Sequence, residues 1–295
     1  MKNADHKTWA ILAVVLASII GGATAPAIKI GLVKIPPLSF SFLRFFLSSI
    51  FILPFFLRDK PSFDQNLKKT LLITLLAVTN IGLFVYGIKL TTASISGLLY
   101  SATVILSVIF SAFFLKEKFP SKRIFFIFLG LFGTALAIFS PLIEKVSIFR
   151  GNLYGNIIIF TAVITWSLYL VLSKRMQKEY SPIVLTSLFI FLSAILFFFL
   201  SLIESVTNFG WWQYIDFPSV ITIIYVSLFS TLLFYLLSQY AVKYGTPVIA
   251  SLSFYISPIM VYFWSFILLG EQLTIGLITG TIIVFFSVIL INYFS

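Results

Sequence analysis

The stretch KLTTASISGLLYSATVILSVIFSAFFLKE at residues 89–117 recurs in altered form as KYGTPVIASLSFYISPIMVYFWSFILLGE at residues 243–271. In both stretches a lysine and a glutamate lie 28 residues apart, with a mostly apolar run between them. A run of about 20 apolar residues can cross the hydrocarbon core of a bilayer as a helix. At a constant offset of 154 residues the matches are Thr92/Thr246, Ile95/Ile249, Leu98/Leu252 and Ile105/Ile259. The two stretches therefore predict transmembrane helices in a chain that contains an internal repeat.

Eight further apolar runs accompany these two, separated by short polar or Pro/Gly segments. The chain of 295 residues is 60% hydrophobic and only 10% charged, whereas soluble domains carry about a quarter charged residues. We therefore predict an all-α integral membrane protein with ten transmembrane helices. The expected helices span residues 9–30, 36–57, 69–89, 92–115, 122–140, 151–173, 181–203, 218–240, 245–269 and 272–294.

Basic residues orient these helices, because Lys and Arg are retained on the cytoplasmic side of a membrane. With the N-terminus inside, 14 Lys and Arg residues fall in inside segments and 5 fall in outside segments. The sequence thus predicts a multi-pass protein of the plasma (inner) membrane with both termini in the cytoplasm. The net charge of +11 is then a topology signal and not a nucleic-acid site.

The N-terminus allows a second interpretation. Lys2 and Lys7, the apolar residues 9–20 and then Ala23-Thr24-Ala25 resemble a cleavable signal peptide. The apolar run continues past this site to Ile30 and has a counterpart in mid-chain. We therefore expect the segment to remain as the first transmembrane helix.

The repeat covers both halves of the chain. Lys29 to Pro37 and Lys174 to Pro182 are both eight residues apart, at an offset of 145. An insertion in the second half, assigned to the loop 204–217, accounts for the nine residues between the two offsets. Since five helices per repeat is an odd number, the repeats 1–143 and 144–295 are predicted to be inverted. Inverted repeats are typical of secondary transporters, in which the two halves alternately close one side of a central site.

Several short motifs carry a resemblance to a known family. Gly22 precedes Lys29 by seven residues, Pro37 and Arg44 follow, Trp166-Ser167 precedes Lys174 and Pro182, and Glu117 and Glu271 end two helices. In order, spacing and duplication the chain resembles the EamA-like family of the drug/metabolite transporter superfamily. It departs from that pattern at Gly21, Val104 and Ser287. The resemblance implies a ten-helix exporter or facilitator of amino acids or related metabolites that works by alternating access.

Arg44 is the sharpest candidate for function, because a charge about eight residues into a transmembrane helix costs a few kcal/mol or more unless it is satisfied. Pro37, Ser41, Arg44 and Ser48 share one helical face. Arg44 either attracts a substrate carboxylate from this face, or it snorkels outward or pairs with backbone carbonyls.

Polar and aromatic residues near the middles of other helices complete the predicted site. Polar tips and aromatic planes at this depth suit an amphipathic metabolite, although Ser and Thr are also ordinary contacts between helices in lipid. The candidate substrate-binding residues are Arg44, Asn80, Tyr100, Thr103, Trp166, Tyr169, Ser253 and Ser257.

Proline and glycine mark other features of the helices. Pro26 and Pro258 each remove a backbone donor and free a carbonyl, which either contacts substrate or accompanies a packing kink. Gly276 and Gly280, with matching small residues at Gly130, Gly133 and Ala137, predict packing seams. The sequence leaves open whether these seams lie within one chain or between two copies.

An intramembrane enzyme is not expected. The predicted helix interiors contain no Cys, His or Asp, and Glu occurs only at helix ends, so neither a nucleophile with a base nor paired carboxylates can form. No phosphate-binding loop, metal site or cofactor motif is predicted. The expected partners are a small-molecule substrate and the lipid bilayer. A lipid-handling or receptor-like membrane protein without solute transport is the alternative.

The same lack of acidic residues bears on energy coupling. Proton-coupled carriers usually place a titratable group near the bilayer centre. Glu117 and Glu271 occupy equivalent helix ends, where we expect them to cap helices or pair with nearby Lys. Facilitated diffusion or exchange is therefore predicted.

Overall fold

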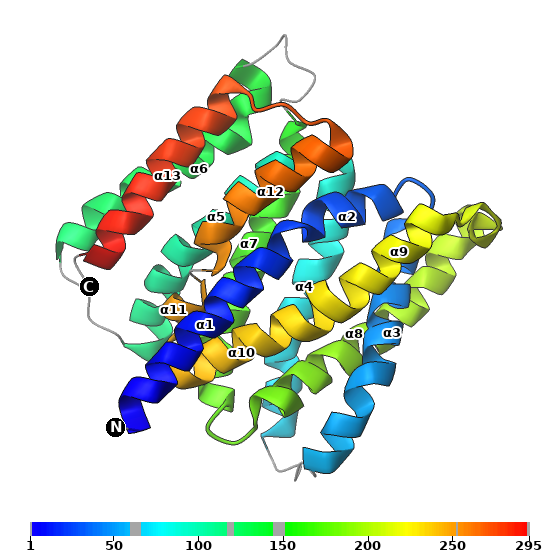
Figure 1. The fold of residues 1–295 in the computed structure, drawn as a ribbon, viewed down its shortest axis with the longest axis horizontal. Coiled ribbons are helices and arrows are strands. Elements are labelled where there is room, and N and C mark those ends of the chain that lie inside the picture. The colour runs from blue at the N-terminus through cyan, green and yellow to red at the C-terminus, as the bar shows by residue number, and fades with distance from the viewer. Residues whose placement is uncertain (1, 60–65, 117–120, 144–150, 252, 294–295) are drawn as a thin grey trace.

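The chain is almost wholly helical in the computed structural model, which describes residues 2–59, 66–116, 121–143, 151–251 and 253–293. No β-strand occurs in these ranges (Figure 1). The elements are α1 (Lys2–Gly22), α2 (Thr24–Gly31), α3 (Pro37–Asp59), α4 (Leu67–Leu90), α5 (Ala93–Phe110), the π-helix η1 (Ser111–Leu115), α6 (Ser121–Ile143), α7 (Leu153–Met176), α8 (Pro182–Thr207), the 3-10 helix η2 (Trp211–Tyr214), α9 (Phe217–Tyr225), the π-helix η3 (Val226–Leu233), α10 (Phe234–Tyr244), α11 (Pro247–Ser251), α12 (Ser253–Leu269) and α13 (Ile275–Tyr293).

Many of these helices have the length and composition of membrane spans. In the described part of the chain, seven are long and apolar enough to cross a bilayer: Leu12–Gly31, Pro37–Asp59, Leu67–Leu90, Ala93–Leu115, Leu153–Met176, Pro182–Thr207 and Phe217–Tyr244. Three shorter apolar helices span Ile124–Ser140, Ser257–Leu269 and Ile275–Ile291. Large apolar side chains such as Phe125, Phe199 and Ile282 are exposed, as on a surface that faces lipid. The chain is therefore a multi-pass membrane protein.

The first expected helix, 9–30, is divided and begins earlier than expected. α1 starts at Lys2 and ends at Gly22, and α2 starts at Thr24. Pro26 explains the division, because proline lacks an N–H group and its ring clashes with the carbonyl four residues earlier. Pro258, by contrast, lies inside α12, which continues through it.

Helices from the two halves of the chain pack on one another in recurring pairs. α3 packs on α8 and α6 packs on α13, at opposite edges of the molecule (Figure 1). Between them α4 packs on α7 as α1 packs on α10, and α5 packs on α7 as α12 packs on α1. α5 also packs on α12, and nearly all its side chains from Ala93 to Val108 are buried. α5 therefore lies at the centre of the fold.

The predicted small-residue seam lies within the chain, between α6 and α13. A Cβ atom added at Gly280 would lie 3.0 Å from the carbonyl oxygen of Gly133, and one at Gly130 would lie 2.6 Å from Oγ of Ser287. These glycines let the two helices approach closely. The sequence had left open a seam between two copies, and the structure places this one inside a single copy.

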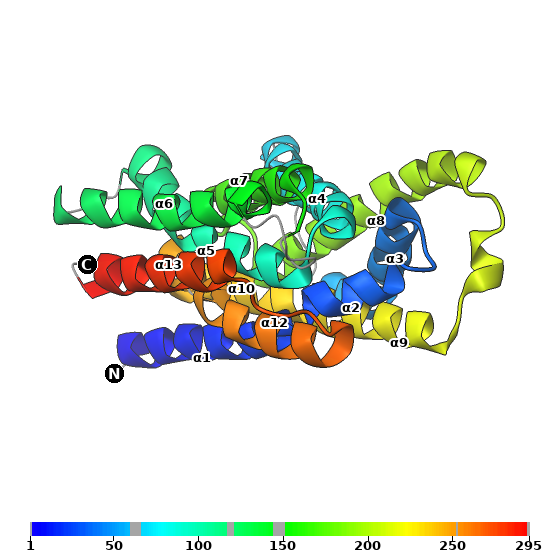
Figure 2. The ribbon, with the colours of Figure 1, turned by 90° about the horizontal axis from the view of Figure 1, so that it is seen from above.

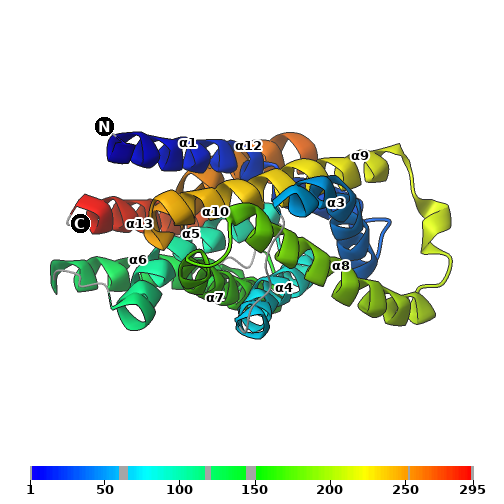
Figure 3. The ribbon, with the colours of Figure 1, turned by 90° about the horizontal axis from the view of Figure 1, so that it is seen from below.

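The connection between α8 and α9 is shorter than predicted. The loop was expected to begin at Glu204, but α8 continues to Thr207. Glu204 therefore lies within the helix, and its carboxylate accepts hydrogen bonds from the backbone N–H groups of Leu38 (3.2 Å) and Ser39 (2.8 Å). The connection lies at the opposite end of the molecule from the two chain termini, as Figure 2 and Figure 3 show.

The antiparallel helices α3 and α8 cap each other at both ends. Glu204, near the end of α8, accepts from the first turn of α3. Asp59, at the end of α3, accepts from the Oγ of Ser181, which precedes α8. Each acidic side chain thus lies at the helix N-terminus of the other element, where the backbone dipole favours negative charge.

Candidate functional site

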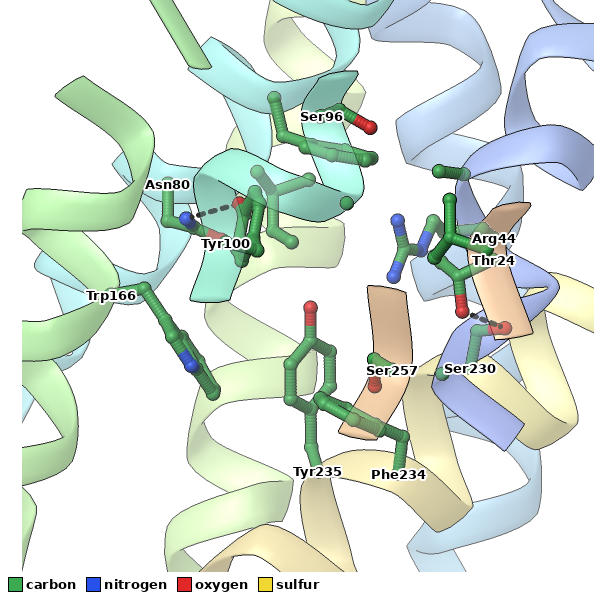
Figure 4. Close-up of a pocket in the computed structure, with 16 residues that line it drawn as sticks. Thr24, Arg44, Asn80, Ser96, Tyr100, Trp166, Ser230, Phe234, Tyr235 and Ser257 are labelled. Atoms are coloured by element: carbon green, nitrogen blue, oxygen red, sulfur yellow. Dashed lines mark hydrogen bonds between the residues drawn. The ribbon is translucent and has the colours of Figure 1, made fainter. Parts of the chain in front are cut away.

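A cavity lies among helices from both halves of the chain (Figure 4). The centre of a water-sized sphere can occupy about 80 Å³ of it, whereas one water needs only ~10–15 Å³ of such space. It therefore has room for several waters or one small organic solute. The lining residues are Gly21, Thr24, Ala25, Arg44, Asn80, Ile81, Phe84, Ser96, Gly97, Tyr100, Trp166, Ser230, Phe234, Tyr235, Ser257 and Val261.

Arg44 is the only charged residue among those described on the cavity wall. Its side chain is 1% exposed, so the outward snorkelling that the sequence allowed does not occur. Nε donates to Oγ1 of Thr231 at 2.7 Å, and the guanidinium carbon lies 5.0 Å from the centroid of the Phe45 ring. The guanidinium faces the space between Tyr100 and Tyr235 (Figure 4). Arg44 thus presents a buried positive charge to the cavity.

The π-helix η3 forms part of the wall that holds Arg44. Oγ1 of Thr231 donates to the carbonyl of Val226, five residues earlier, while it accepts from Arg44. Ser48, one turn after Arg44, donates to the carbonyl of Ser227 at 2.8 Å. π-Helical turns are rare and often occur at functional sites, and this one supplies the polar groups that position the arginine.

Asn80 connects three helices beside the cavity. Its amide nitrogen donates to the hydroxyl of Tyr100 at 2.7 Å and to the carbonyl of Ala162 at 2.7 Å. Tyr100 in turn packs edge-on against the Phe84 ring, with centroids 5.4 Å apart. These contacts hold a phenol and a carboxamide at the cavity wall in a defined orientation.

Aromatic rings form the opposite wall. Trp166, 1% exposed, lies 5.2 Å from Tyr235 and 5.3 Å from Tyr169 between ring centroids. Tyr235 also packs edge-on against Phe189 at 4.7 Å. In Figure 4 the hydroxyl of Tyr235 points into the cavity toward Arg44. The wall therefore combines flat apolar surface with a polar tip, as an amphipathic solute requires.

Small polar groups surround the break between α1 and α2. Oγ1 of Thr24 donates to Oγ of Ser230 at 2.8 Å, and Oγ of Ser257 donates to the carbonyl of Ser253 at 2.7 Å. Ser257 is also 3.5 Å from the carbonyl of Ser18. The division at Pro26 thus lies against the cavity, with hydroxyl groups on both sides of it.

The structure brings together five of the eight residues predicted for the site. Arg44, Asn80, Tyr100, Trp166 and Ser257 line the cavity. Whether they bind a solute stays a prediction.

The other three lie outside the cavity lining. Tyr169 is behind Trp166 and accepts a hydrogen bond from Nε2 of Gln239 at 3.1 Å. Ser253 supports Ser257 one turn away and bonds to the carbonyl of Ala250. Thr103 continues the lining face of α5 beyond Tyr100.

The sequence reasoning missed Ser96 on α5, and Ser230 and Tyr235 on the eighth expected helix. A signal existed in the eighth helix: Ser227, Ser230, Thr231, Tyr235 and Ser238 recur at spacings typical of one helical face. Thr24 figures in the sequence analysis only as part of the stretch that resembles a signal-peptide cleavage site.

A row of hydroxyl groups extends from the cavity along α5 to the start of η1. Ser96 and Tyr100 line the cavity, and Thr103, Ser107 and Ser111 follow on the same face at intervals of three or four residues. The hydroxyls of these last three are buried and have no hydrogen-bond partner in the described structure. Burying a hydroxyl group without a hydrogen-bond partner costs about 1–3 kcal/mol. Packing between helices therefore does not by itself explain this row of hydroxyl groups.

Glu271 lies away from the cavity, at the start of α5. Its carboxylate accepts from the N–H groups of Ala93 and Ser94, both at 2.9 Å, and from Oγ of Ser94 at 2.8 Å. It also pairs with Lys29 at 3.4 Å. The prediction that Glu271 caps a helix and pairs with Lys is confirmed. Glu117, its predicted equivalent, lies outside the described residues.

Comparison with known proteins identifies the family of this chain. The model of the EamA-like transporter family matches the chain twice, at residues 8–139 and 153–293. This chain belongs to the EamA-like transporter family. The resemblance read from its short motifs is thereby confirmed. EamA-like relatives include the uncharacterized transporter YoaV of Bacillus subtilis, 27% identical over 93% of each chain.

Other relatives and a solved structure agree with this membership. An uncharacterized transporter of Archaeoglobus fulgidus is 24% identical over 97% of this chain and 98% of its own length. One of Clostridium kluyveri is 26% identical over 88% and 84%. A protein of known crystal structure shares the fold with a TM-score of 0.69 at 15% identity, covering 95% of this chain and 94% of that one. As an EamA-like transporter, the chain has a small molecule as its expected substrate.

Proposed function

We propose that this EamA-like transporter moves small metabolites such as amino acids by alternating access through the central cavity. The observation that carries the proposal is the cavity itself, a polar and aromatic chamber lined from both halves of a membrane protein. Arg44, Asn80, Tyr100, Trp166 and Ser257 form its solute site. Arg44 holds an acidic group of the solute by charge-assisted hydrogen bonds, and the rings pack on its apolar part.

The proposed architecture is ten transmembrane helices in two inverted repeats, 1–143 and 144–295. The two matches of the family model, one in each half, support this division. The helix pairs support it too, because α4 on α7 is the repeat equivalent of α1 on α10, and α5 on α7 that of α12 on α1. The α6, α12 and α13 segments then supply the three spans beyond the seven long ones.

Two lysines at equivalent positions make equivalent contacts. Nζ of Lys29 donates to the carbonyl of Thr91 at 2.5 Å, and Nζ of Lys174 donates to the carbonyl of Gly245 at 2.9 Å. The lysines are offset by 145 residues and their acceptors by 154, which are the two repeat offsets in the sequence. Such a coincidence is expected if the two halves are related by an inverted symmetry.

The same offsets support a solute site on the proposed symmetry axis. Gly21 corresponds to Trp166 and Asn80 corresponds to Phe234, and all four line the cavity. A Cβ atom at Gly21 would lie 3.1 Å from the Phe234 ring. Each half therefore contributes an equivalent pair of positions to the cavity wall. Different residue types occupy these positions in the two halves, so the proposed site is asymmetric.

The cytoplasmic half of the solute path runs along the hydroxyl row of α5. By the repeat offset, Thr103 corresponds to Ser257 and Ser107 corresponds to Val261, and both counterparts line the cavity in this conformation. When the halves exchange roles, Thr103 and Ser107 take the lining positions and their hydroxyls become hydrated. Tyr169, the counterpart of Thr24, joins them.

A labelling experiment tests this path, since the chain contains no native Cys. We expect Ser107→Cys to react with a membrane-impermeant maleimide from the cytoplasmic side, at a rate that a transported solute changes. Ile105→Cys is the matched control, because Ile105 is equally buried but faces α6, where it meets Gly130. Equal labelling of the two positions, or none at Ser107→Cys, would contradict the path.

Both termini are proposed to be cytoplasmic, in the plasma (inner) membrane. The excess of basic residues in the inside segments supports this orientation, and the chain ends lie at the same end of the molecule (Figure 2).

The transport mode is proposed to be facilitated diffusion or exchange without proton coupling. Two of the acidic groups described near helix ends, Glu271 and Glu204, already cap helices. Purified protein in proteoliposomes should take up labelled amino acids and related metabolites down a gradient with no pH difference imposed. Accumulation driven by a pH step and abolished by Glu271→Gln or Glu117→Gln would refute this mode, and uptake of no solute would refute transport itself.

A further inference from the structure

The described wall of the cavity carries one formal charge. Arg44 supplies it, and none of the other lining residues is acidic or basic. A guanidinium stays protonated in proteins. The described wall therefore has a formal charge of +1.

This charge has only neutral partners. Arg44 donates to the hydroxyl of Thr231 and lies over the Phe45 ring, and the hydroxyl groups of Tyr235 and Tyr100 also face it. Within the described chain, the one ion pair joins Lys29 to Glu271, and Glu204 caps α3. No described carboxylate thus neutralises Arg44, although an uncompensated charge removed from water is costly.

A negatively charged ligand would supply the counter-ion that Arg44 lacks. A solute with one negative charge leaves the occupied site neutral. A zwitterionic amino acid leaves a charge of +1 and brings an ammonium group for which the described wall has no carboxylate. A dianion leaves an excess negative charge. Charge balance in a low-dielectric site therefore favours the monoanion over both.

The walls indicate the rest of the ligand. Trp166, Phe84 and Phe234 offer apolar surface on the cavity wall. If the body of the solute carried charged or strongly hydrated groups, those groups would lose their water against these rings without compensation. We propose that the preferred solute class is a monocarboxylate with an aromatic or apolar body, and that it binds more tightly than the amino acid of the same body. This inference rests on the proposed transport function and narrows its substrate class.

A charge series on one phenyl body tests the inference. Isothermal titration calorimetry on the purified protein would compare 3-phenylpropionate (charge −1), phenylalanine (zwitterion), phenylsuccinate (−2) and phenethylamine (+1). We expect 3-phenylpropionate to bind tightest, with a Kd about tenfold or more below that of phenylalanine, because the ammonium group of phenylalanine would be buried without a partner, at a cost of about 1–3 kcal/mol or more. Phenethylamine should bind weakest.

Variants of Arg44 assign the preference to its charge. Arg44→Gln should remove the advantage of 3-phenylpropionate, and Arg44→Lys should retain part of it. Arg58→Gln is the matched control, because Arg58 lies on the same helix but is exposed at its end, and it should leave all four affinities unchanged. If Arg44→Gln does not fold, the wild-type series and Arg44→Lys still decide the question.

Three outcomes would overturn the inference, and the first two concern the order of the affinities. The first is phenylalanine binding as tightly as 3-phenylpropionate, and the second is a preference for 3-phenylpropionate that survives Arg44→Gln. Neither touches the transport proposal, which fails separately if proteoliposomes take up no solute. Binding by none of the four compounds would also overturn the inference and leave the proteoliposome assay to judge transport.

Discussion

Replacing Glu271 by Gln should destabilise the protein by loosening the start of α5. Glu271 is 5% exposed. One oxygen of its carboxylate accepts from the N–H group of Ala93 and the other from that of Ser94. Glutamine offers one acceptor oxygen in place of two. One backbone N–H therefore loses its partner in a buried site, and the other exchanges a charge-assisted bond for a neutral one. The ion pair with Lys29 is lost as well, but the lysine is partly exposed and the pair contributes little.

The magnitude follows from these two changes. A buried donor without a partner costs about 1–3 kcal/mol, and a bond to a charged group exceeds a neutral one by roughly 1 kcal/mol. The variant should thus lose about 2–4 kcal/mol of unfolding free energy. Glu204→Gln makes the same change at the start of α3, but Glu204 is only half-buried. Water can replace the missing acceptor there, so this variant should lose less than about 1 kcal/mol.

Unfolding in mixed micelles of a mild detergent and SDS, followed by tryptophan fluorescence, would measure both values. The reasoning is refuted if Glu271→Gln lies within about 0.5 kcal/mol of the wild type, or if Glu204→Gln is the more damaging change.

Three further outcomes are expected. A single Cys at position 34 should be labelled by an impermeant reagent from outside and one at position 178 only from the cytoplasm; the opposite pattern would refute the inverted repeat. Trp166→Ala should weaken solute binding by roughly tenfold, because it removes most of one aromatic wall, while size-exclusion chromatography shows an intact monodisperse protein. Unchanged affinity would remove Trp166 from the site. Gly22→Ala should destabilise by about 1–3 kcal/mol in the same micelle titration, since overpacking has this cost and the new Cβ would lie 2.2 Å from Cβ of Met260; a neutral effect would show that α1 and α12 can separate freely.

The amino-acid sequence predicted the helices well because the bilayer imposes their length. The run 36–57 became Pro37–Asp59 and the run 69–89 became Leu67–Leu90. Arg44 and Asn80 could be predicted as site residues because strongly polar side chains are rare within apolar runs.

The rest of the site depends on which face each helix turns to its neighbours. Trp166 and Tyr169 lie one turn apart, yet only Trp166 lines the cavity. The π-turn η3 shifts the helical phase before Tyr235, and a rule based on 3.6 residues per turn does not include such a shift. The sequence also could not decide whether Arg44 is buried, because an arginine that faces the cavity and one that snorkels outward occupy the same position in an apolar run.

The mutual capping of α3 and α8 limits how this pair of helices can move. α3 has 23 residues and is therefore about 34 Å long at 1.5 Å per residue. Turning one helix against the other by ~5° about their midpoints would carry each end about 1.5 Å sideways, which is enough to break a hydrogen bond. Sliding them by one turn would strip both caps together. We therefore expect α3 and α8 to move as one rigid unit, and we expect bending within the molecule to occur at the division before Pro26 and at η3.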